Sequence, residues 1–244
     1  MKILLTGDKG YLGSEFVKKY GDTYEIVGYD KQGSLDLLDY QTLTERMAGC
    51  TQVVHLAAIP KPVQGIDFPE YFKNNVEATM NVFRAALETG VERVVYASST
   101  TIYGIEGGIP FQTPIKENQP FVSQYLKADQ LSTREADLSY HMSKVMAEQV
   151  AAWFGLNKKI QSATLRFGPI NKVFLGTSVS INNATQAIQL ALDFPGELWY
   201  EAFSIVDEVP HIDITKAKTV LGYRPETPVY SGEQIRSGLE DRAK

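Results

Sequence analysis

Hydrophobic and polar positions follow two different periods in the first half of the chain. Short β-branched runs predict strands, and the longer segments between them carry apolar residues at helical spacing. The predicted strands cover residues 2–6, 25–29, 52–56 and 93–97. Strands that alternate with helices run parallel, and a parallel sheet is covered by helices on both faces. The pattern therefore predicts an α/β fold with a doubly wound parallel sheet, the Rossmann architecture.

The hydrophobic pattern is less regular in the second half. Residues 111–139 are rich in Pro, Gln, Ser and Asp, which predicts a loop region, and a helical pattern then covers residues 140–154. A further helix, a strand and a short helix are expected at residues 183–192, 198–204 and 214–221. We expect residues 1–168 to form a cofactor-binding domain with the catalytic residues. Residues 169–244 are expected to form a small, shortened C-terminal substrate cap, interleaved with that domain rather than independent of it.

Residues 75–87 predict a helix that is apolar on more than one side. Val76, Met80, Phe83 and Leu87 share one face at helical spacing, and small apolar residues form a second face. Such a helix packs on the sheet, and the second face can also form a subunit interface. A homodimer is one expectation, and intrachain packing alone is the alternative.

Composition and charge narrow the possible partners. Of the 244 residues, 43% are hydrophobic and 22% charged, as in an ordinary globular protein. The formal net charge of -5, with Lys and Arg scattered, offers no basic surface for nucleic acid. The first apolar run is too short to cross a membrane. We therefore expect a small-molecule substrate and neither nucleic acid nor a membrane as partner.

Cysteine and histidine are too few and too scattered to predict a metal site. The single Cys50 can form neither an intrachain disulfide nor a zinc site, which favours a cytoplasmic protein. His141 and His211 have no ligand spacing with each other or with carboxylates. His55 lies in an apolar strand, where a hydrogen-bonded core histidine is the simpler interpretation. No metal is expected.

A glycine-rich loop joins the first predicted strand to the first predicted helix. Its sequence, Thr6-Gly7-Asp8-Lys9-Gly10-Tyr11-Leu12-Gly13, has the spacing of a dinucleotide-binding loop. Glycines allow a tight turn and a close approach of the backbone to a pyrophosphate, which binds at a helix N-terminus. A simple turn is the alternative. The loop residues expected to contact the cofactor are Gly7, Gly10, Tyr11, Leu12 and Gly13.

Asp30 follows the second predicted strand, at the distance from the loop where an acid binds adenosine ribose. A carboxylate there would repel the extra phosphate of NADP, so we expect NAD, with NADP less favoured. Lys9 and Lys31 flank the same place and could soften this preference. Both lysines could equally be ordinary solvated surface, although we include Lys31 among the cofactor residues.

Tyr140 and Lys144 lie four residues apart at the start of a helical pattern, which puts them on one helix face. An unperturbed phenol titrates near pH 10, so it needs an adjacent cation to act as a general base near neutrality. Ser99 follows the fourth predicted strand, at the sheet edge where ligands bind, and could donate to a substrate oxygen. We expect these three residues to be catalytic. A serine that only caps the following turn is the alternative for Ser99.

These features together resemble the extended short-chain dehydrogenases, the family of NAD-dependent sugar epimerases and dehydratases. The resemblance runs through most of the chain in the family's order. Its segments are the glycine loop, Asp36-Leu37, residues 54–58, the helix start at Asn75, residues 98–104, residues 140–144, residues 165–169, residues 213–217 and residues 221–225. The resemblance implies that Ser99 assists Tyr140. It also implies cofactor contacts at Asp36, Leu37, Leu56, Ala57, Ala58, Asn75, Ala97, Ser98 and Phe167, as well as at Tyr140 and Lys144.

Two departures from the family pattern bear on the substrate. The chain is longer than usual around residues 123–139 and much shorter between Arg166 and Ser178, where relatives place most of their nucleotide-diphosphate contacts. The short segment offers only Lys172 and Phe174 as anchors, although Tyr125 and Lys127 in the long segment could compensate. Asn182-Asn183 also stands where relatives carry an acidic pair. The short cap resembles that of uronate dehydrogenases, although their substrate-holding arginine has no evident counterpart.

The resulting hypothesis is an NAD-dependent oxidoreductase that acts on a secondary alcohol or ketone of a sugar, sugar acid or similar small polar substrate. The alternative is a nucleotide-sugar epimerase or dehydratase, like UDP-glucose 4-epimerase, that uses bound NAD transiently. A non-catalytic dinucleotide sensor is a third interpretation, and the joint presence of Ser99, Tyr140 and Lys144 disfavours it.

Overall fold

The computed structural model of the protein describes residues 1–104, 113–125, 135–172 and 177–229. The chain divides into two compact units. The first comprises Met1–Ser98, Thr133–Thr164 and Phe194–Glu201, and the second comprises Ser99–Ser132, Leu165–Asp193 and Ala202–Lys244.

Six strands form one sheet in the order β2-β1-β3-β4-β5-β6. Their bounds are β1 Lys2–Thr6, β2 Glu25–Tyr29, β3 Gln52–His55, β4 Arg93–Ser99, β5 Gln161–Phe167 and β6 Glu201–Ile205. β1 pairs in parallel with both β2 and β3, and β3 pairs in parallel with β4. The strand order therefore reverses between β1 and β3, and the carboxyl ends of strands at such a switch point form a ligand-binding edge.

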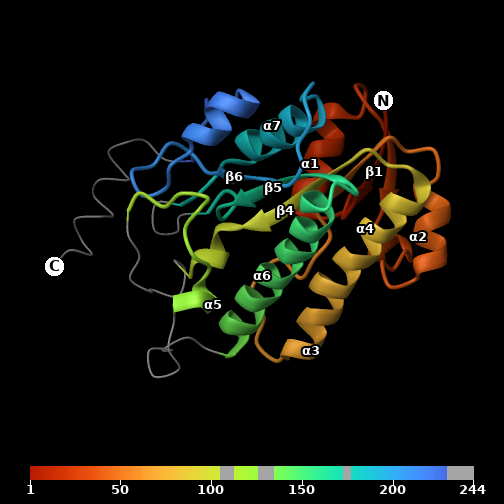
Figure 1. Ribbon diagram of the computed structural model, residues 1–244, viewed down its shortest axis with the longest axis horizontal. Helices are drawn as coiled ribbons and strands as arrows, with labels where there is room; N and C mark the ends of the chain where they lie inside the picture. The colour runs from red at the N-terminus through yellow and green to blue at the C-terminus, as the bar shows by residue number, and fades with distance from the viewer. Residues whose placement is uncertain (105–112, 126–134, 173–176, 230–244) are drawn as a thin grey trace. The chain divides into compact units, whose positions relative to one another are not determined.

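Helices cover both faces of the sheet in the first unit (Figure 1). They are α1 Tyr11–Tyr20, α2 Tyr40–Met47, α3 Phe68–Tyr71, the π-helix η2 Phe72–Glu77, α4 Ala78–Thr89 and α6 Glu135–Leu156, with the short 3-10 helix η1 at Lys31–Gly33. On one face of the sheet, Leu4, Val53 and Val94 pack in one core with α2, α4 and α6. Side chains alternate along a strand, so the strand residues next to these three are buried on the opposite face, which α1 covers. The sheet is thus apolar on both sides, as its hydrophobic strands require.

The second unit contains the shorter elements. They are the 3-10 helix η3 Thr100–Tyr103, α5 Val122–Tyr125, α7 Ile181–Leu192 and the π-helix η6 Ala217–Leu221. Arg166 is buried with its guanidinium over the rings of Tyr103 and Phe121, 5.3 and 5.4 Å from their centroids. Asp207 is also buried, and its carboxylate accepts hydrogen bonds from Asn183 and from the backbone nitrogens of Ser180 and Val229.

The predicted α/β Rossmann class is confirmed, and several boundaries are corrected. The loop predicted for residues 111–139 is wrong at its C-terminal end, because α6 begins at Glu135. Glu135 and Asp137 favour helix in this first turn, where acidic side chains complement the helix dipole. The strand expected at 198–204 is Glu201–Ile205, and the third strand ends at His55 rather than Leu56. Much of the long segment 123–139, including Lys127, lies outside the described residues, as does Phe174.

The helix predicted over residues 75–87 is η2 followed by α4, and its apolar face divides between core and surface. Val76 is 7% and Phe83 0% exposed, whereas Met80 and Leu87 are 37% and 45% exposed. The expectation that these four residues share one buried face is therefore wrong, because the buried side of α4 is formed by Phe83 with the smaller residues Ala78, Val82, Ala85 and Ala86, and Met80 and Leu87 lie at its outer side. Within the described ranges, no helix has the length and apolar character needed to span a bilayer.

Candidate active site

The glycine loop connects β1 to α1 in the first unit. Gly7 has a φ of +76°, and a Cβ added to it would lie 2.9 Å from the backbone nitrogen of Ala57. A Cβ on Gly13 would lie 2.1 Å from the carbonyl oxygen of Gly7. Gly10 is the N-cap of α1, and no side chain caps that helix end. The loop thus offers bare backbone at a helix N-terminus, an arrangement that fits a pyrophosphate. The other predicted loop residues, Tyr11 and Leu12, are the first two residues of α1.

His55 joins the loop to β3 and α4. Its ring nitrogens lie 2.8 Å from the Thr6 hydroxyl and 3.0 Å from the Thr79 hydroxyl. Burial and the nearby charge of Lys144 lower the pKa of His55 to about 3, so the ring is neutral near pH 7. The prediction of a hydrogen-bonded core histidine is confirmed. The Thr6 hydroxyl also accepts a hydrogen bond from the backbone nitrogen of Ala57 at 3.2 Å, which places the expected cofactor residues Leu56, Ala57 and Ala58 at the loop.

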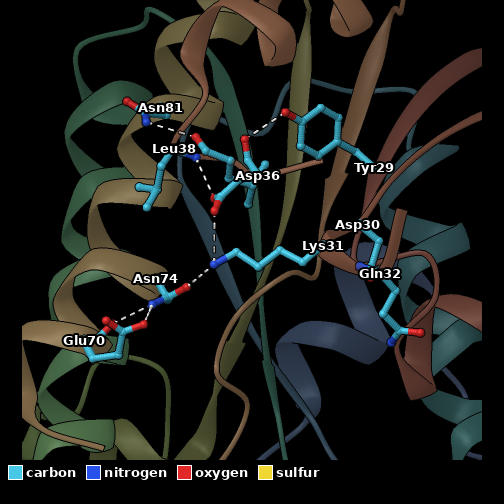
Figure 2. Close-up of polar contacts among 10 residues, drawn as sticks. Tyr29, Asp30, Lys31, Gln32, Asp36, Leu38, Glu70, Asn74 and Asn81 are labelled. Atoms are coloured by element: carbon cyan, nitrogen blue, oxygen red, sulfur yellow. Dashed lines mark hydrogen bonds and ion pairs between the residues drawn. The ribbon is translucent and has the colours of Figure 1, made fainter. Parts of the chain in front are cut away.

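Polar contacts fix the segment that follows β2 (Figure 2). The Asp30 carboxylate accepts a hydrogen bond from the backbone nitrogen of Gln32 at 2.8 Å. The Lys31 side chain extends away from Asp30, and its ammonium lies 2.7 Å from Asn74 Oδ1 and 3.4 Å from an Asp36 carboxylate oxygen. Lys31 is therefore engaged with Asp36 and Asn74 rather than with Asp30.

Leu37 follows Asp36 in the chain, and its side chain is part of the hydrophobic core. Its side chain is 7% exposed, and its carbonyl oxygen accepts a hydrogen bond from Asn81 at 3.0 Å. The Tyr29 hydroxyl donates to the Asp36 carbonyl oxygen at 2.9 Å. Asp36 and Leu37, expected as cofactor contacts, are thus held by hydrogen bonds from Tyr29 and Asn81, and the Leu37 side chain packs in the core.

Asn75 ties the loop after β3 to two helices. Its amide oxygen accepts a hydrogen bond from the backbone nitrogen of Ile59 at 2.7 Å, and its amide nitrogen donates to the Ile59 carbonyl and to Ser143 Oγ, at 3.2 and 2.9 Å. Asn75 lies in η2, and single π-helical turns within α-helices often mark functional positions. This predicted cofactor residue therefore shapes the rim beside α6.

Tyr140 and Lys144 occupy successive turns of α6, as their spacing predicts. Both are buried, at 6% and 4% exposure. The Lys144 ammonium donates to the Ala97 carbonyl oxygen at 2.7 Å and lies 5.0 Å from the ring centroid of Tyr96. Burial lowers the pKa of Lys144 to about 8, while the charge of Glu148 opposes that shift, so the side chain is mostly charged near pH 7. The structure thus holds a cation one turn from the Tyr140 phenol.

Two residues around this pair were not predicted from the sequence. The Tyr71 ring packs 6.2 Å from the Tyr140 ring, and its hydroxyl donates to the Lys61 carbonyl oxygen. Glu148 is fully buried, and its carboxylate accepts hydrogen bonds from Ser98 Oγ at 2.5 Å and from the Tyr200 hydroxyl at 2.9 Å. The spacing of Glu148, four residues beyond Lys144, was an available signal, since i and i+4 side chains meet on a helix.

Ser99 and Phe167 belong to the second unit, so their proximity to Tyr140 stays a prediction. The Ser99 hydroxyl caps η3 by accepting a hydrogen bond from the backbone nitrogen of Thr101 at 3.2 Å. The capping role considered as the alternative is therefore present, and it leaves the hydroxyl hydrogen free to donate elsewhere. Phe167 ends β5 and is 6% exposed. In the described parts of the chain, His, Cys, Asp and Glu form no group of three placed to hold a metal.

Comparison with known proteins bears directly on this site. Residues 3–170 match the NAD dependent epimerase/dehydratase family. A cinnamoyl-CoA reductase 1 of Petunia hybrida is 32% identical over 73% of this chain and 54% of its own. A uronate dehydrogenase of Pseudomonas putida is 24% identical over 98% of this chain and 88% of its own. The chain spans 64%, 54%, 62% and 47% of the first four curated relatives it matches.

A solved structure supports the fold over the whole chain. MoeE5, in complex with UDP-glucuronic acid and NAD, superposes with a TM-score of 0.75 at 21% identity, and the match covers 100% of both chains. The family match includes the glycine loop, β1 to β5 and the Tyr140–Lys144 helix, and its name agrees with the predicted dinucleotide chemistry. The chain therefore belongs to the NAD-dependent epimerase/dehydratase family.

Proposed function

We propose that this protein is an NAD-dependent oxidoreductase acting on a secondary alcohol, or the corresponding ketone, of a sugar, sugar acid or similar small polar molecule. The observation that carries the proposal is the pair on α6: a buried Lys144 ammonium, fixed to the Ala97 carbonyl, one turn from Tyr140. The same unit contains a glycine loop that fits a dinucleotide, with Asp30 after the next strand.

The residues of the chain have separate tasks in this reaction. Bound NAD supplies the hydride acceptor. Tyr140 takes the alcohol proton, and Lys144 favours the phenolate form because a nearby cation lowers the pKa of a phenol. Ser99 donates a hydrogen bond to the substrate oxygen. The proposed cofactor residues are the glycine loop, Asp30, Lys31, Asp36, Leu37, Leu56, Ala57, Ala58, Asn75, Ala97, Ser98 and Phe167.

Free rather than nucleotide-linked substrates are favoured by the short segment after Arg166. A diphosphate needs cations or unused backbone N–H groups. The described ends of this segment are hydrogen-bonded to each other through the backbone. The Asn171 nitrogen donates to the Val179 carbonyl at 2.9 Å, and the Val179 nitrogen donates to the Pro169 carbonyl at 3.1 Å. Lys172 is its one cation in the sequence. The match to a uronate dehydrogenase, over 98% of this chain and 88% of its own, supports a free sugar acid as substrate. Residues 169–244 are the proposed substrate-binding region.

The direct test is a screen of the purified protein with NAD against free sugars, uronates and nucleotide sugars, with NADH absorbance as the readout. Accumulation of NADH with a free sugar or sugar acid is the expected result. Absence of NADH with every free substrate, together with interconversion of a nucleotide sugar, would overturn the proposal.

A nucleotide-sugar epimerase or dehydratase is the second candidate. The likeness to MoeE5, solved with UDP-glucuronic acid, is the observation that favours it. Calorimetric titration of the NAD-loaded protein with UDP, dTDP and GDP separates the two, because low-micromolar binding of any of them would promote the epimerase function over the dehydrogenase.

The glycine loop provides a matched pair of variants. In Gly10→Val, the new side chain would occupy the space expected for the pyrophosphate, while a Cβ there meets only the Gly7 carbonyl oxygen at 3.2 Å. We expect this variant to fold and to lose the rise in melting temperature that NAD gives the unaltered protein. Gly13→Val should instead lower the melting temperature without ligand, because its Cβ would lie 2.1 Å from the same oxygen. A Gly10→Val protein that NAD still stabilises would contradict the assignment of the loop.

We also propose that the protein is a homodimer through the outer faces of α4 and α6, which run side by side (Figure 1). Met80 and Leu87 on α4, and Met146 and Trp153 on α6, are 36% to 53% exposed, and each pair is spaced by two helical turns. Light scattering at micromolar concentration should show a dimer, and Trp153→Glu a monomer. A monomeric unaltered protein would remove this proposal.

A further inference from the structure

Asp8 is a part of the glycine loop that the dinucleotide assignment leaves unused. It lies between Gly7 and Gly10, and its carboxylate lies against β2. A Cβ added to Gly28 would lie 2.4 Å from one Asp8 carboxylate oxygen and 3.2 Å from the other. Because Gly28 has no side chain, the Asp8 carboxylate can fill the space beside it. Gly28 lies two residues before Asp30 in the chain.

One oxygen of this carboxylate, Oδ1, is buried without a hydrogen-bond partner. A buried acceptor without a donor is costly, and such groups usually have a partner in the functional state. Burial raises the pKa of Asp8, and the negative charge of Asp30 adds to this, while backbone hydrogen bonds from Asp8 itself and from Tyr29, and the charge of Lys9, oppose the shift. The two carboxylates are thus close enough to interact at the edge where β1 and β2 end.

Lys31, the cation next to Asp30 in the chain, extends away from the Asp30 carboxylate. Figure 2 shows Lys31 extended toward Asp36 and Asn74, and Asn74 is held in turn by Glu70 at 2.6 Å. Lys31 therefore pairs with Asp36 and Asn74 rather than with Asp30. Lys9 lies near Gly33, since a Cβ added to Gly33 would be 3.1 Å from the Lys9 ammonium. Lys9 is the cation whose charge lowers the pKa of Asp8.

We propose that Asp8 is a second specificity-determining carboxylate of the dinucleotide site, whose unpaired oxygen accepts a hydrogen bond from a hydroxyl of the adenosine ribose. Together with Asp30 it places two negative charges where NADP carries its additional phosphate. The inference rests on the proposed NAD binding. It assigns the cofactor preference to a pair of carboxylates rather than to Asp30 alone.

The test compares the affinities for NAD and NADP of four proteins by isothermal titration calorimetry at constant salt: the unaltered chain, Asp8→Asn, Gly28→Ala and Asp22→Asn. Asp8→Asn keeps the shape of the side chain and removes its charge, and Gly28→Ala displaces the carboxylate. Asp22→Asn is the control, because it makes the same change of net charge at an exposed position after α1.

We expect NAD affinity to fall about tenfold in Asp8→Asn, as when a charge-assisted hydrogen bond becomes a neutral one. NADP affinity should rise, so that the preference for NAD shrinks, and Gly28→Ala should also lose NAD affinity. Asp22→Asn should match the unaltered chain. An unchanged NAD affinity and preference in Asp8→Asn would overturn the inference, and so would the same loss in Asp22→Asn. If the unaltered chain binds neither dinucleotide, the proposed function itself fails, which is a distinguishable result.

Discussion

Replacing Tyr140 with Phe is expected to lower turnover by about 10²–10⁴-fold, the usual contribution of a positioned general acid or base. The variant removes only the hydroxyl, while the ring keeps its place beside Tyr71. The buried side chain and the Lys144 contact to Ala97 are unchanged, so folding and NAD binding should be retained. The measurement is the steady-state rate with the substrate found by the screen.

Tyr71→Phe is the matched control for this substitution. It removes a phenol hydroxyl from the neighbouring ring, where that group donates to the Lys61 carbonyl and accepts from the Val63 backbone nitrogen. Its effect on turnover should be far smaller than that of Tyr140→Phe. Comparable losses in the two variants would show that the rate depends on packing around the rings, and the assignment of Tyr140 as proton acceptor would then fail.

The parts of this site that the sequence predicts are those encoded within a few neighbouring residues. The glycine loop combines a strand, a turn and a helix start in consecutive positions, and Tyr140 and Lys144 are adjacent because one helical turn places them so. The parallel direction of the strands follows from their alternation with helices. For such features, local propensity and tertiary structure agree.

Features that depend on contacts between distant segments were not predicted. Glu148 is held by Ser98 and Tyr200, which lie 50 and 52 residues away in the chain, and hydrophobic periodicity carries no information on such partners. The Asp8 carboxylate has its space only because β1 and β2 pair in a register that brings Gly28 beside the loop. The early start of α6 was hidden by a polar composition, although Glu135 and Asp137 were a local signal for it.

Glu148 is expected to contribute both to the free energy of unfolding and to the charge state of Lys144. Its carboxylate lies fully buried, accepts two hydroxyl hydrogen bonds, and supports the charge of Lys144 one turn earlier. Glu148→Ala would leave the Ser98 and Tyr200 hydroxyls without their acceptor and Lys144 without its counter-charge. A hydrogen bond to a charged acceptor contributes about 1.5–3 kcal/mol, and Glu148 accepts two of them. Urea unfolding should show a loss of this order, and a loss below about 1 kcal/mol would contradict the network.

Glu148→Gln separates the charge from the hydrogen bonds. The amide oxygen can still accept from a hydroxyl, so this variant should lose less unfolding free energy than Glu148→Ala. Without the carboxylate charge, burial acts unopposed and the pKa of Lys144 should fall below its value of about 8. Because Lys144 favours the Tyr140 phenolate only while protonated, the alkaline loss of activity that follows its deprotonation should move to lower pH. His55, neutral because its pKa is about 3, and the buried Tyr96 phenol face Lys144 from the sheet and do not titrate in this range. A pH profile of turnover identical to that of the unaltered protein would show that Glu148 is structural only.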